Sequence, residues 1–213
     1  MIDMQGKRAR RVVTGRKPRV TGRYPSMKSN RTVQWESQLE RDFIMLLEFD
    51  PSVCRYREQP KTVEIKVHNG PNFHYTPDFY AERLDGRYVY EVKEARELQK
   101  DDIRRRLTLA GELMVSEGYF FQVVTEETIR VQPLLGNIRM LLPLRSVDVP
   151  EECLDSAKEY LSQQGATPFH ELAPIVAPGA QGWMYLKALI SHHKLKAPLD
   201  SEDLTADSLI SPA

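Results

Sequence analysis

The chain has 213 residues, with 30 Lys and Arg against 30 Asp and Glu, so its formal net charge is zero. The hydrophobic fraction of 41% is ordinary for a globular protein, and no apolar run approaches the roughly 20 residues of a membrane-spanning helix. Membrane and fibrous classes are therefore excluded, and the charged start, without an apolar signal segment, favours the cytoplasm. Two cysteines, Cys54 and Cys153, are too few and too far apart to indicate a zinc site or a disulfide framework.

The zero net charge conceals a basic N-terminal segment. Residues 1–31 contain ten bases and one acid, a net charge of +9, whereas the remaining residues contain 20 bases and 29 acids. Glycines and prolines interrupt this segment, and its few bulky apolar side chains predict a flexible arm. Such arms commonly contact nucleic-acid phosphates, although a solvated tail without a specific role is the alternative. The DNA-binding residues predicted here are Arg8, Arg10, Arg11, Arg16, Lys17, Arg19 and Arg23.

The segment 32–145 combines helical and strand patterns. Apolar side chains at helical spacing predict amphipathic helices over residues 33–49 and 100–117. The order of elements, α-β-β-β-β-α-β, predicts an α/β domain with a mixed sheet flanked by helices. Runs rich in β-branched and aromatic residues predict the strands 53–58, 62–67, 73–80, 87–93 and 119–125.

The segment 146–213 has a different composition, with ten acids, four bases and six prolines. This change predicts a second, small domain that is mainly helical. Helical patterns cover 151–164 and 182–193, and a short helix is expected over 201–209, with Ser201 as its N-cap. The spacing fits a helix-turn-helix or winged-helix-like arrangement, and the acidic balance favours contact with protein over contact with phosphate.

Three charged residues on two neighbouring strands form the candidate catalytic group. Asp78 follows Pro77, and Glu91 and Lys93 lie on the next strand, where alternation places both on one face. If the two strands pair, Asp78 approaches Glu91, and two adjacent carboxylates favour a bridging divalent cation. Oxygen ligands of this kind suit Mg²⁺ or Mn²⁺ and metal-assisted phosphodiester hydrolysis, with Lys93 orienting the nucleophile.

A third acid is expected from the first helix, where Glu36 and Glu40 lie four residues apart on one face. Each part of this pattern also has a structural interpretation. A Glu-x-Lys sequence on a strand is commonly a solvated face, and an aspartate after a proline is often a turn residue. The joint occurrence of these features on a helix and two strands is what favours catalysis.

The arrangement resembles the PD-(D/E)xK nuclease core, which implies a restriction-endonuclease-like fold. Over residues 35–145 the chain further resembles the TnsA endonuclease subunit of Tn7-like heteromeric transposases. In that family the acid that closes the Ser-x-x-Glu run of the first helix is a metal ligand, which implies Glu40 here. The resemblance also implies Asp78 and Glu91 as ligands and Lys93 as the catalytic lysine, although some relatives have Gln in place of Glu91. The resembling segments are residues 37–43, 47–51, 57–60, 75–79 and 91–93.

The resemblance implies a Mg²⁺-dependent DNA endonuclease that cuts the 5′ ends of a transposon during cut-and-paste transposition. Its implied partners are a DDE transposase, TnsB, which cuts the 3′ ends, and an AAA+ regulator, TnsC. Two alternatives stay open at this point. One is a stand-alone restriction-type nuclease or resolvase, and the other is a catalytically silent subunit that binds DNA and supports assembly.

Overall fold

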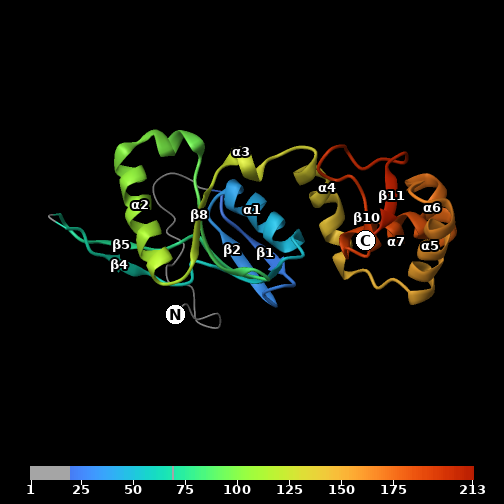
Figure 1. The fold of residues 1–213 in the computed structure, drawn as a ribbon, viewed down its shortest axis with the longest axis horizontal. Helices are drawn as coiled ribbons and strands as arrows, with labels where there is room; N and C mark the ends of the chain where they lie inside the picture. Colours follow the sequence, from blue (N-terminus) through green and yellow to red (C-terminus); the bar gives the residue numbers. More distant parts are fainter. Residues whose placement is uncertain (1–19, 69) are drawn as a thin grey trace. The chain divides into compact units, whose positions relative to one another are not determined.

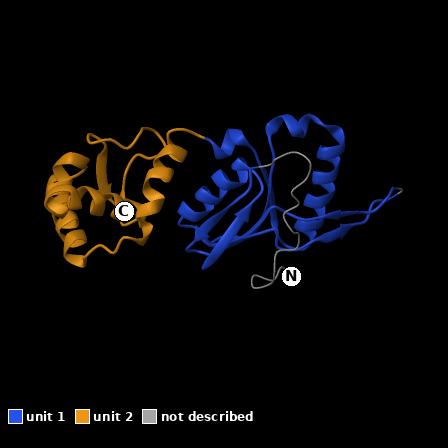
Figure 2. Cartoon of the chain, turned by 180° about the vertical axis from the view of Figure 1, so that it is seen from behind, with its two compact units in different colours: residues 1–130 blue, residues 131–213 orange. Residues whose placement is uncertain are grey.

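The computed structural model describes residues 20–68 and 70–213. The chain divides into two compact units between Arg130 and Val131 (Figure 2). The sequence predicted a domain boundary at 145/146, so the second unit includes residues that were assigned to the nuclease domain. Within the described part of the chain, no helix has the length and apolar character needed to cross a membrane.

The first unit is built around a four-stranded mixed sheet in the order β3-β6-β7-β8. The first two pairings are antiparallel, and β7 pairs with β8 in parallel. This architecture confirms the predicted restriction-endonuclease-like α/β fold. The strands are β3 (Val53–Glu58), β6 (Phe79–Arg83), β7 (Gly86–Val92) and β8 (Phe120–Val124), and the main helices are α1 (Gln38–Phe49) and α2 (Asp101–Ser116).

Helices α1 and α2 cover opposite faces of this sheet (Figure 1). Phe43 of α1 contacts Phe79 and Tyr90 edge to face, at centroid distances of 5.5 and 5.0 Å. On the other face, Met114 of α2 packs in a cluster with Val89. Because successive strand residues point to opposite faces, Tyr90 packs in the hydrophobic core with α1 and Val89 packs in the core with α2. Glu91 therefore lies on the α2 face of the sheet, as does Val89.

The predicted strand 73–80 is divided in the structure. Its first part forms β5 (Phe73–Tyr75), which pairs only with β4 (Val63–Ile65) as a separate hairpin, and its second part begins β6. Pro77 lies at the break. A proline has no backbone N–H to donate to a strand ladder, so the chain leaves one sheet and enters another at this point.

The predicted arm is ordered over its last residues. Strands β1 (Gly22–Ser26) and β2 (Arg31–Trp35) form an antiparallel hairpin, so the expectations of an arm through residue 31 and of a helix from residue 33 are both corrected. Trp35 and Val33 on β2 are buried in the α1 core. Burial of these side chains outweighs the helical spacing of Trp35 with Leu39, and α1 begins after its N-cap, Ser37.

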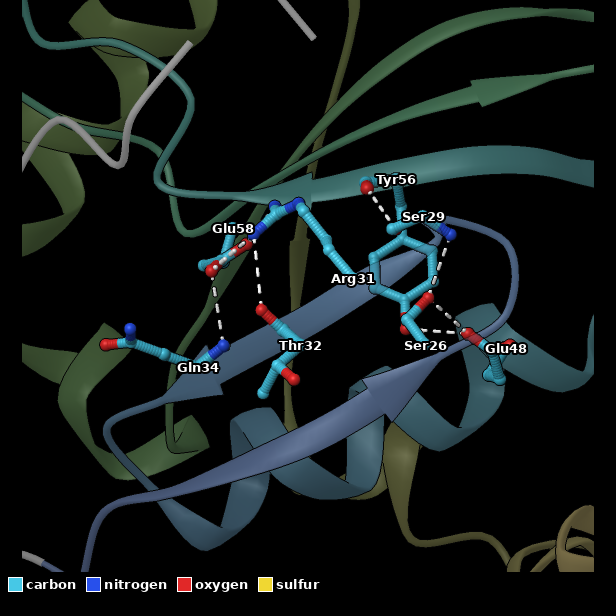
Figure 3. A network of polar contacts seen from close by, with 8 residues as sticks. All are labelled: Ser26, Ser29, Arg31, Thr32, Gln34, Glu48, Tyr56 and Glu58. Atoms are coloured by element: carbon cyan, nitrogen blue, oxygen red, sulfur yellow. Dashed lines mark hydrogen bonds and ion pairs between the residues drawn. The ribbon is translucent and has the colours of Figure 1, made fainter. Parts of the chain in front are cut away.

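A buried glutamate joins the hairpin to the core (Figure 3). Glu48, near the end of α1, is 2% exposed and accepts hydrogen bonds from Ser26 Oγ and Tyr56 Oη, both at 2.8 Å. The backbone N–H of Met27 donates to the same carboxylate at 3.0 Å. Three donors from two other elements thus satisfy a carboxylate that would otherwise be costly to bury.

A second acid supports the same hairpin from β3 (Figure 3). Glu58 is buried, accepts the backbone N–H of Gln34 at 3.2 Å, and forms an ion pair with Arg31. Both Glu48 and Glu58 are therefore structural acids. Their contacts explain why a segment of basic and polar residues folds onto this unit.

The second unit contains four α-helices and a small antiparallel sheet in the order β10-β11-β9. Gly182 of α7 allows α6 and α7 to pack closely, because an added Cβ would lie 2.1 Å from the carbonyl oxygens of Ala173 and Ala177. The elements are α4 (Leu134–Leu141), α5 (Glu151–Gln164), β9 (Thr167–Pro168), α6 (Phe169–Val176), α7 (Gly179–Ser191), β10 (Leu195–Lys196) and β11 (Leu209–Pro212). Three shorter helices complete the two units: η1 (Ala95–Gln99), α3 (Glu126–Ile129) and η2 (Leu142–Ser146).

The predicted helix over residues 201–209 is wrong. This segment consists of turns that lead into β11, and the buried Asn137 of α4 determines its path. Asn137 Nδ2 donates to the carbonyls of Leu199 and Glu202, both at 2.8 Å, and its Oδ1 accepts the N–H of Leu204 at 2.9 Å. A side chain distant in sequence thus replaces the local hydrogen bonds that a helix would have used.

Candidate active site

Asp78 lies at the break between β5 and β6, immediately before the paired strand. Phe79 is opposite Tyr90 in the register, so Asp78 comes level with Glu91. Asp78 Oδ2 accepts the backbone N–H of Val92 at 2.8 Å, and the carbonyl of Asp78 accepts the N–H of Gln59 at 2.8 Å. The proline that separates the two sheets thereby brings an aspartate against the end of β7.

Glu91 is 5% exposed and is held by two side chains. Lys93 Nζ lies 2.8 Å from Glu91 Oε1, which agrees with the prediction that these residues share one face of the strand. Tyr75 Oη donates to Glu91 Oε2 at 2.8 Å. The sequence analysis assigned no role to Tyr75. Its side chain reaches Glu91 from β5, which lies outside the main sheet, so strand alternation alone gave no signal for this contact.

The electrostatics of this group differ from those of an ordinary surface cluster. Burial, together with the nearby charge of Glu91, raises the pKa of Asp78 well above its usual value, and Lys93 offsets only part of this rise. Burial lowers the pKa of Lys93, but the carboxylates of Asp78 and Glu91 outweigh it and leave the pKa above its usual value. Two carboxylates thus share one ammonium, and the site gains from additional positive charge.

Glu40 lies in the first turn of α1 and faces the same region. Its charge contributes to the raised pKa of Asp78, after the larger effects of burial and of Glu91. Glu40 Oε2 accepts the backbone N–H of Glu36 at 2.8 Å, while Ser37 Oγ accepts the N–H of Glu40 at 3.0 Å. Ser37 therefore caps the helix, and the Glu40 carboxylate is held by the backbone N–H of the residue before the cap.

Glu36, whose role the sequence left open, is also buried at the site. Its Oε1 accepts a hydrogen bond from Gln59 Nε2 at 3.2 Å. Gln59 has a left-handed backbone with φ 39°, and its own side-chain oxygen is buried with no hydrogen-bond partner among the described residues. Such a conformation is unusual for a residue before proline, and the sequence gave no sign of it.

A cleft of about 750 Å³ connects these elements. It is lined by the start of α1, by the end of β7 with Lys93, and by η1 and α3. Acids outnumber bases in this lining, so a nucleic-acid phosphate could enter only with added positive charge. The charged lining residues are Glu36, Glu40, Glu94, Glu97, Glu126, Lys93, Arg96 and Arg130.

The carboxylates next to Val92 and Lys93, which line this cleft, fit a hard divalent cation. Asp78 and Glu91 are adjacent carboxylates, and Mg²⁺ is commonly bound through one or two protein carboxylates, with water and substrate phosphate completing its shell. Within residues 20–68 and 70–213, no three His, Cys, Asp or Glu side chains form a ready ligand group. Glu40 is therefore near the pair without being preformed as a third ligand.

A comparison with known protein families found a match, which covers the strands that carry the candidate site. Residues 50–126 match the family described as TnsA-like endonuclease N-terminal, that is, 77 of the 213 residues. The chain carries a TnsA-like endonuclease domain. This finding confirms the resemblance drawn from the sequence motifs, and the matched segment includes Asp78, Glu91 and Lys93. Glu40 precedes the match. A search of curated proteins found no significant match.

The predicted DNA-binding residues lie mostly outside the described part of the chain. Arg23 is described and lies exposed on β1. Val20, the first described residue, lines the cleft. The residues outside the described range are Arg8, Arg10, Arg11, Arg16, Lys17 and Arg19.

Proposed function

We propose that this TnsA-like protein is a Mg²⁺-dependent DNA endonuclease that cuts the 5′ ends of a transposon during cut-and-paste transposition. The observation that carries the proposal is the grouping of Asp78, Glu91 and Lys93 within the segment that matches the TnsA-like family. Mn²⁺ is an alternative to Mg²⁺, because both are hard cations suited to carboxylate ligands.

Each side chain of the site would have a separate role in phosphodiester hydrolysis. Asp78 and Glu91 would hold the metal ion, and Tyr75 keeps the Glu91 carboxylate oriented through its 2.8 Å hydrogen bond. The bound ion would supply Lewis acidity and a more acidic water. Lys93 has a raised pKa and is therefore protonated at neutral pH, so it provides a positive charge for the phosphate or the attacking hydroxide and does not act as a base.

The remaining parts of the chain fit a role within a transposase assembly. The basic segment at the start of the sequence would follow the DNA backbone, while the second unit, with ten acids against six bases, would contact protein. The expected partners are the transposon-end DNA, a DDE transposase of the TnsB type that cuts the 3′ ends, and an AAA+ regulator of the TnsC type.

Cleavage of each strand, measured separately, tests this function. Purified protein is incubated with partner proteins, Mg²⁺ and a labelled transposon-end duplex. Asp78→Ala should lower 5′-strand cleavage by more than about a hundredfold, because loss of a metal ligand exceeds the 10–100-fold effect of losing an outer contact. Cleavage of the 3′ strand should continue.

The matched control is Asp85→Ala, because Asp85 is an exposed carboxylate in the β6–β7 turn and does not line the cleft. This variant should cut like wild type. Unchanged 5′ cleavage in Asp78→Ala would favour a catalytically silent assembly subunit. Efficient cutting by the wild-type protein without partners would favour a stand-alone nuclease.

A further inference from the structure

A buried carboxylate beside the cleft holds two arginines. Asp42 lies on α1, and its side chain is 1% exposed. Arg41 Nη2 donates to Asp42 Oδ1 at 2.8 Å, and Arg130 Nε donates to Asp42 Oδ2 at 2.8 Å. Arg41 is also placed over the ring of Trp35, 5.9 Å from its centroid. The two guanidinium groups therefore bind opposite oxygens of the same anion.

This three-residue cluster carries one more positive than negative charge. A buried carboxylate requires a cationic or hydrogen-bonding partner, and Arg41 already provides one from the adjacent position. Arg130 comes from the end of α3, 88 residues away in sequence, and adds a second cation. The burial of Asp42 does not by itself require this second charge.

Arg130 presents its charge to the catalytic cleft. It lines the same cleft as Lys93 and Glu40, and its side chain is 42% exposed. The contact with Asp42 uses Nε, while a guanidinium carries five N–H donors in a planar fork. A fork fixed at one nitrogen and open to solvent is well suited to bind a phosphate oxygen.

The other cations of the cleft are tied to acids of the site itself. Lys93 pairs with Glu91, and Arg96 pairs with Glu94, which also lines the cleft. Arg130 is instead tied to an anion that a second arginine neutralises. Among these three cations, Arg130 is therefore the one whose charge is least neutralised by nearby carboxylates.

One acid of the lining lies close to Arg130 in the sequence. Glu126, on α3, accepts the backbone N–H of Ala95 at 2.8 Å, and this backbone contact is the largest cause of its lowered pKa. Arg130 and Arg96 contribute smaller electrostatic effects. The main stabilisation of the Glu126 carboxylate thus comes from a backbone N–H and not from Arg130.

We propose that Arg130, held by Asp42, binds a DNA phosphate that flanks the scissile phosphate. The inference rests on the proposed DNA-cutting function and extends it by naming a backbone contact on the cleft wall. It assigns to Arg130 a role in substrate positioning and no role in the chemical step.

The test is DNA binding as a function of salt, in a full-length background that carries Asp78→Ala so that cutting is blocked. The probe is a labelled duplex of about 30 base pairs, long enough to span the cleft and the basic arm. Loss of one phosphate contact should reduce the log–log salt slope by about 0.9 and weaken binding about eightfold at 0.1 M salt in Arg130→Ala. Arg130→Lys keeps the charge and should keep the slope.

Arg55→Ala is the matched control, since Arg55 also forms an ion pair with a carboxylate, Glu82, but does not line the cleft. It should bind with the wild-type slope. An Arg130→Ala slope equal to that of Arg55→Ala, with thermal melting unchanged, would overturn the inference. Because binding is measured without cutting, this failure is distinct from failure of the proposed function, which would appear as a wild-type protein that never cleaves 5′ ends.

Discussion

Two acidic groups in the first unit, Glu48 and the pair Asp78 and Glu91, differ in what surrounds them. Glu48 receives hydrogen bonds from Ser26, Tyr56 and the backbone of Met27, all neutral donors. Asp78 lies beside a second carboxylate, Glu91, and both depend on one lysine. The first arrangement satisfies the charge within the protein, whereas the second leaves it in need of an external cation. Burial alone therefore does not distinguish a structural acid from a candidate metal ligand. The groups that contact the carboxylate do distinguish them.

The largest expected effect comes from removing the charge of Asp78. Asp78→Asn should lower 5′-strand cleavage by more than about a hundredfold, because an amide is a poor metal ligand. The same change should raise the melting temperature of metal-free protein, since it removes repulsion with Glu91. Cleavage assays and thermal melting with EDTA measure the two effects. A variant that loses activity together with stability would place Asp78 in the same class as Glu48.

Removing the structural acid Glu48 should lower stability and leave metal binding unchanged. Glu48→Ala leaves the donors of Ser26, Tyr56 and Met27 without their acceptor, at a cost of about 3 kcal/mol in the free energy of unfolding. Denaturant unfolding measures this loss. Protein that remains folded should bind Mg²⁺ with wild-type affinity, and weaker metal binding in that fraction would show that the two acidic groups are coupled.

Tyr75 contributes to the site through Glu91. Tyr75→Phe removes the hydrogen bond to Glu91 Oε2 while keeping the ring packed, so metal affinity or cleavage should fall by about 10- to 100-fold. Titration with Mg²⁺ separates this from a loss of stability. Tyr80→Phe is the control, because the Tyr80 hydroxyl donates to Glu82 and not to Asp78 or Glu91.

The smallest effect is a pH dependence of the metal-free protein. The pKa of Asp78 is raised in the folded state, so the folded chain binds more protons than the unfolded chain above the usual aspartate pKa of about 4. Stability should therefore fall as pH rises from about 4 through the raised pKa. Denaturant unfolding with EDTA at several pH values would show this, and Asp78→Asn should remove it. An unchanged slope in that variant would assign the effect to other groups.

Local sequence patterns were sufficient to predict an element where one of its faces is buried. The spacing of Leu39, Phe43 and Leu47 predicted α1, and alternation along β7 placed Glu91 and Lys93 together. Patterns failed where distant contacts replace local ones. Asn137 holds the segment expected as a helix over 201–209 in turns, and Glu48 and Glu58 fix a hairpin in the predicted arm.

The sequence by itself determined the elements and the chemical types at the site, because hydrophobic period and turn residues act over a few neighbouring positions. It also placed an aspartate after a proline and a Glu-x-Lys on one strand. Only the tertiary structure decided which acids are catalytic candidates and which are structural. Glu36, Glu40, Asp42 and Glu48 all lie on or next to one helix, yet their partners come from residues up to 88 positions away. An acid's role depends on burial and on the charges that surround it, and distant parts of the chain supply both.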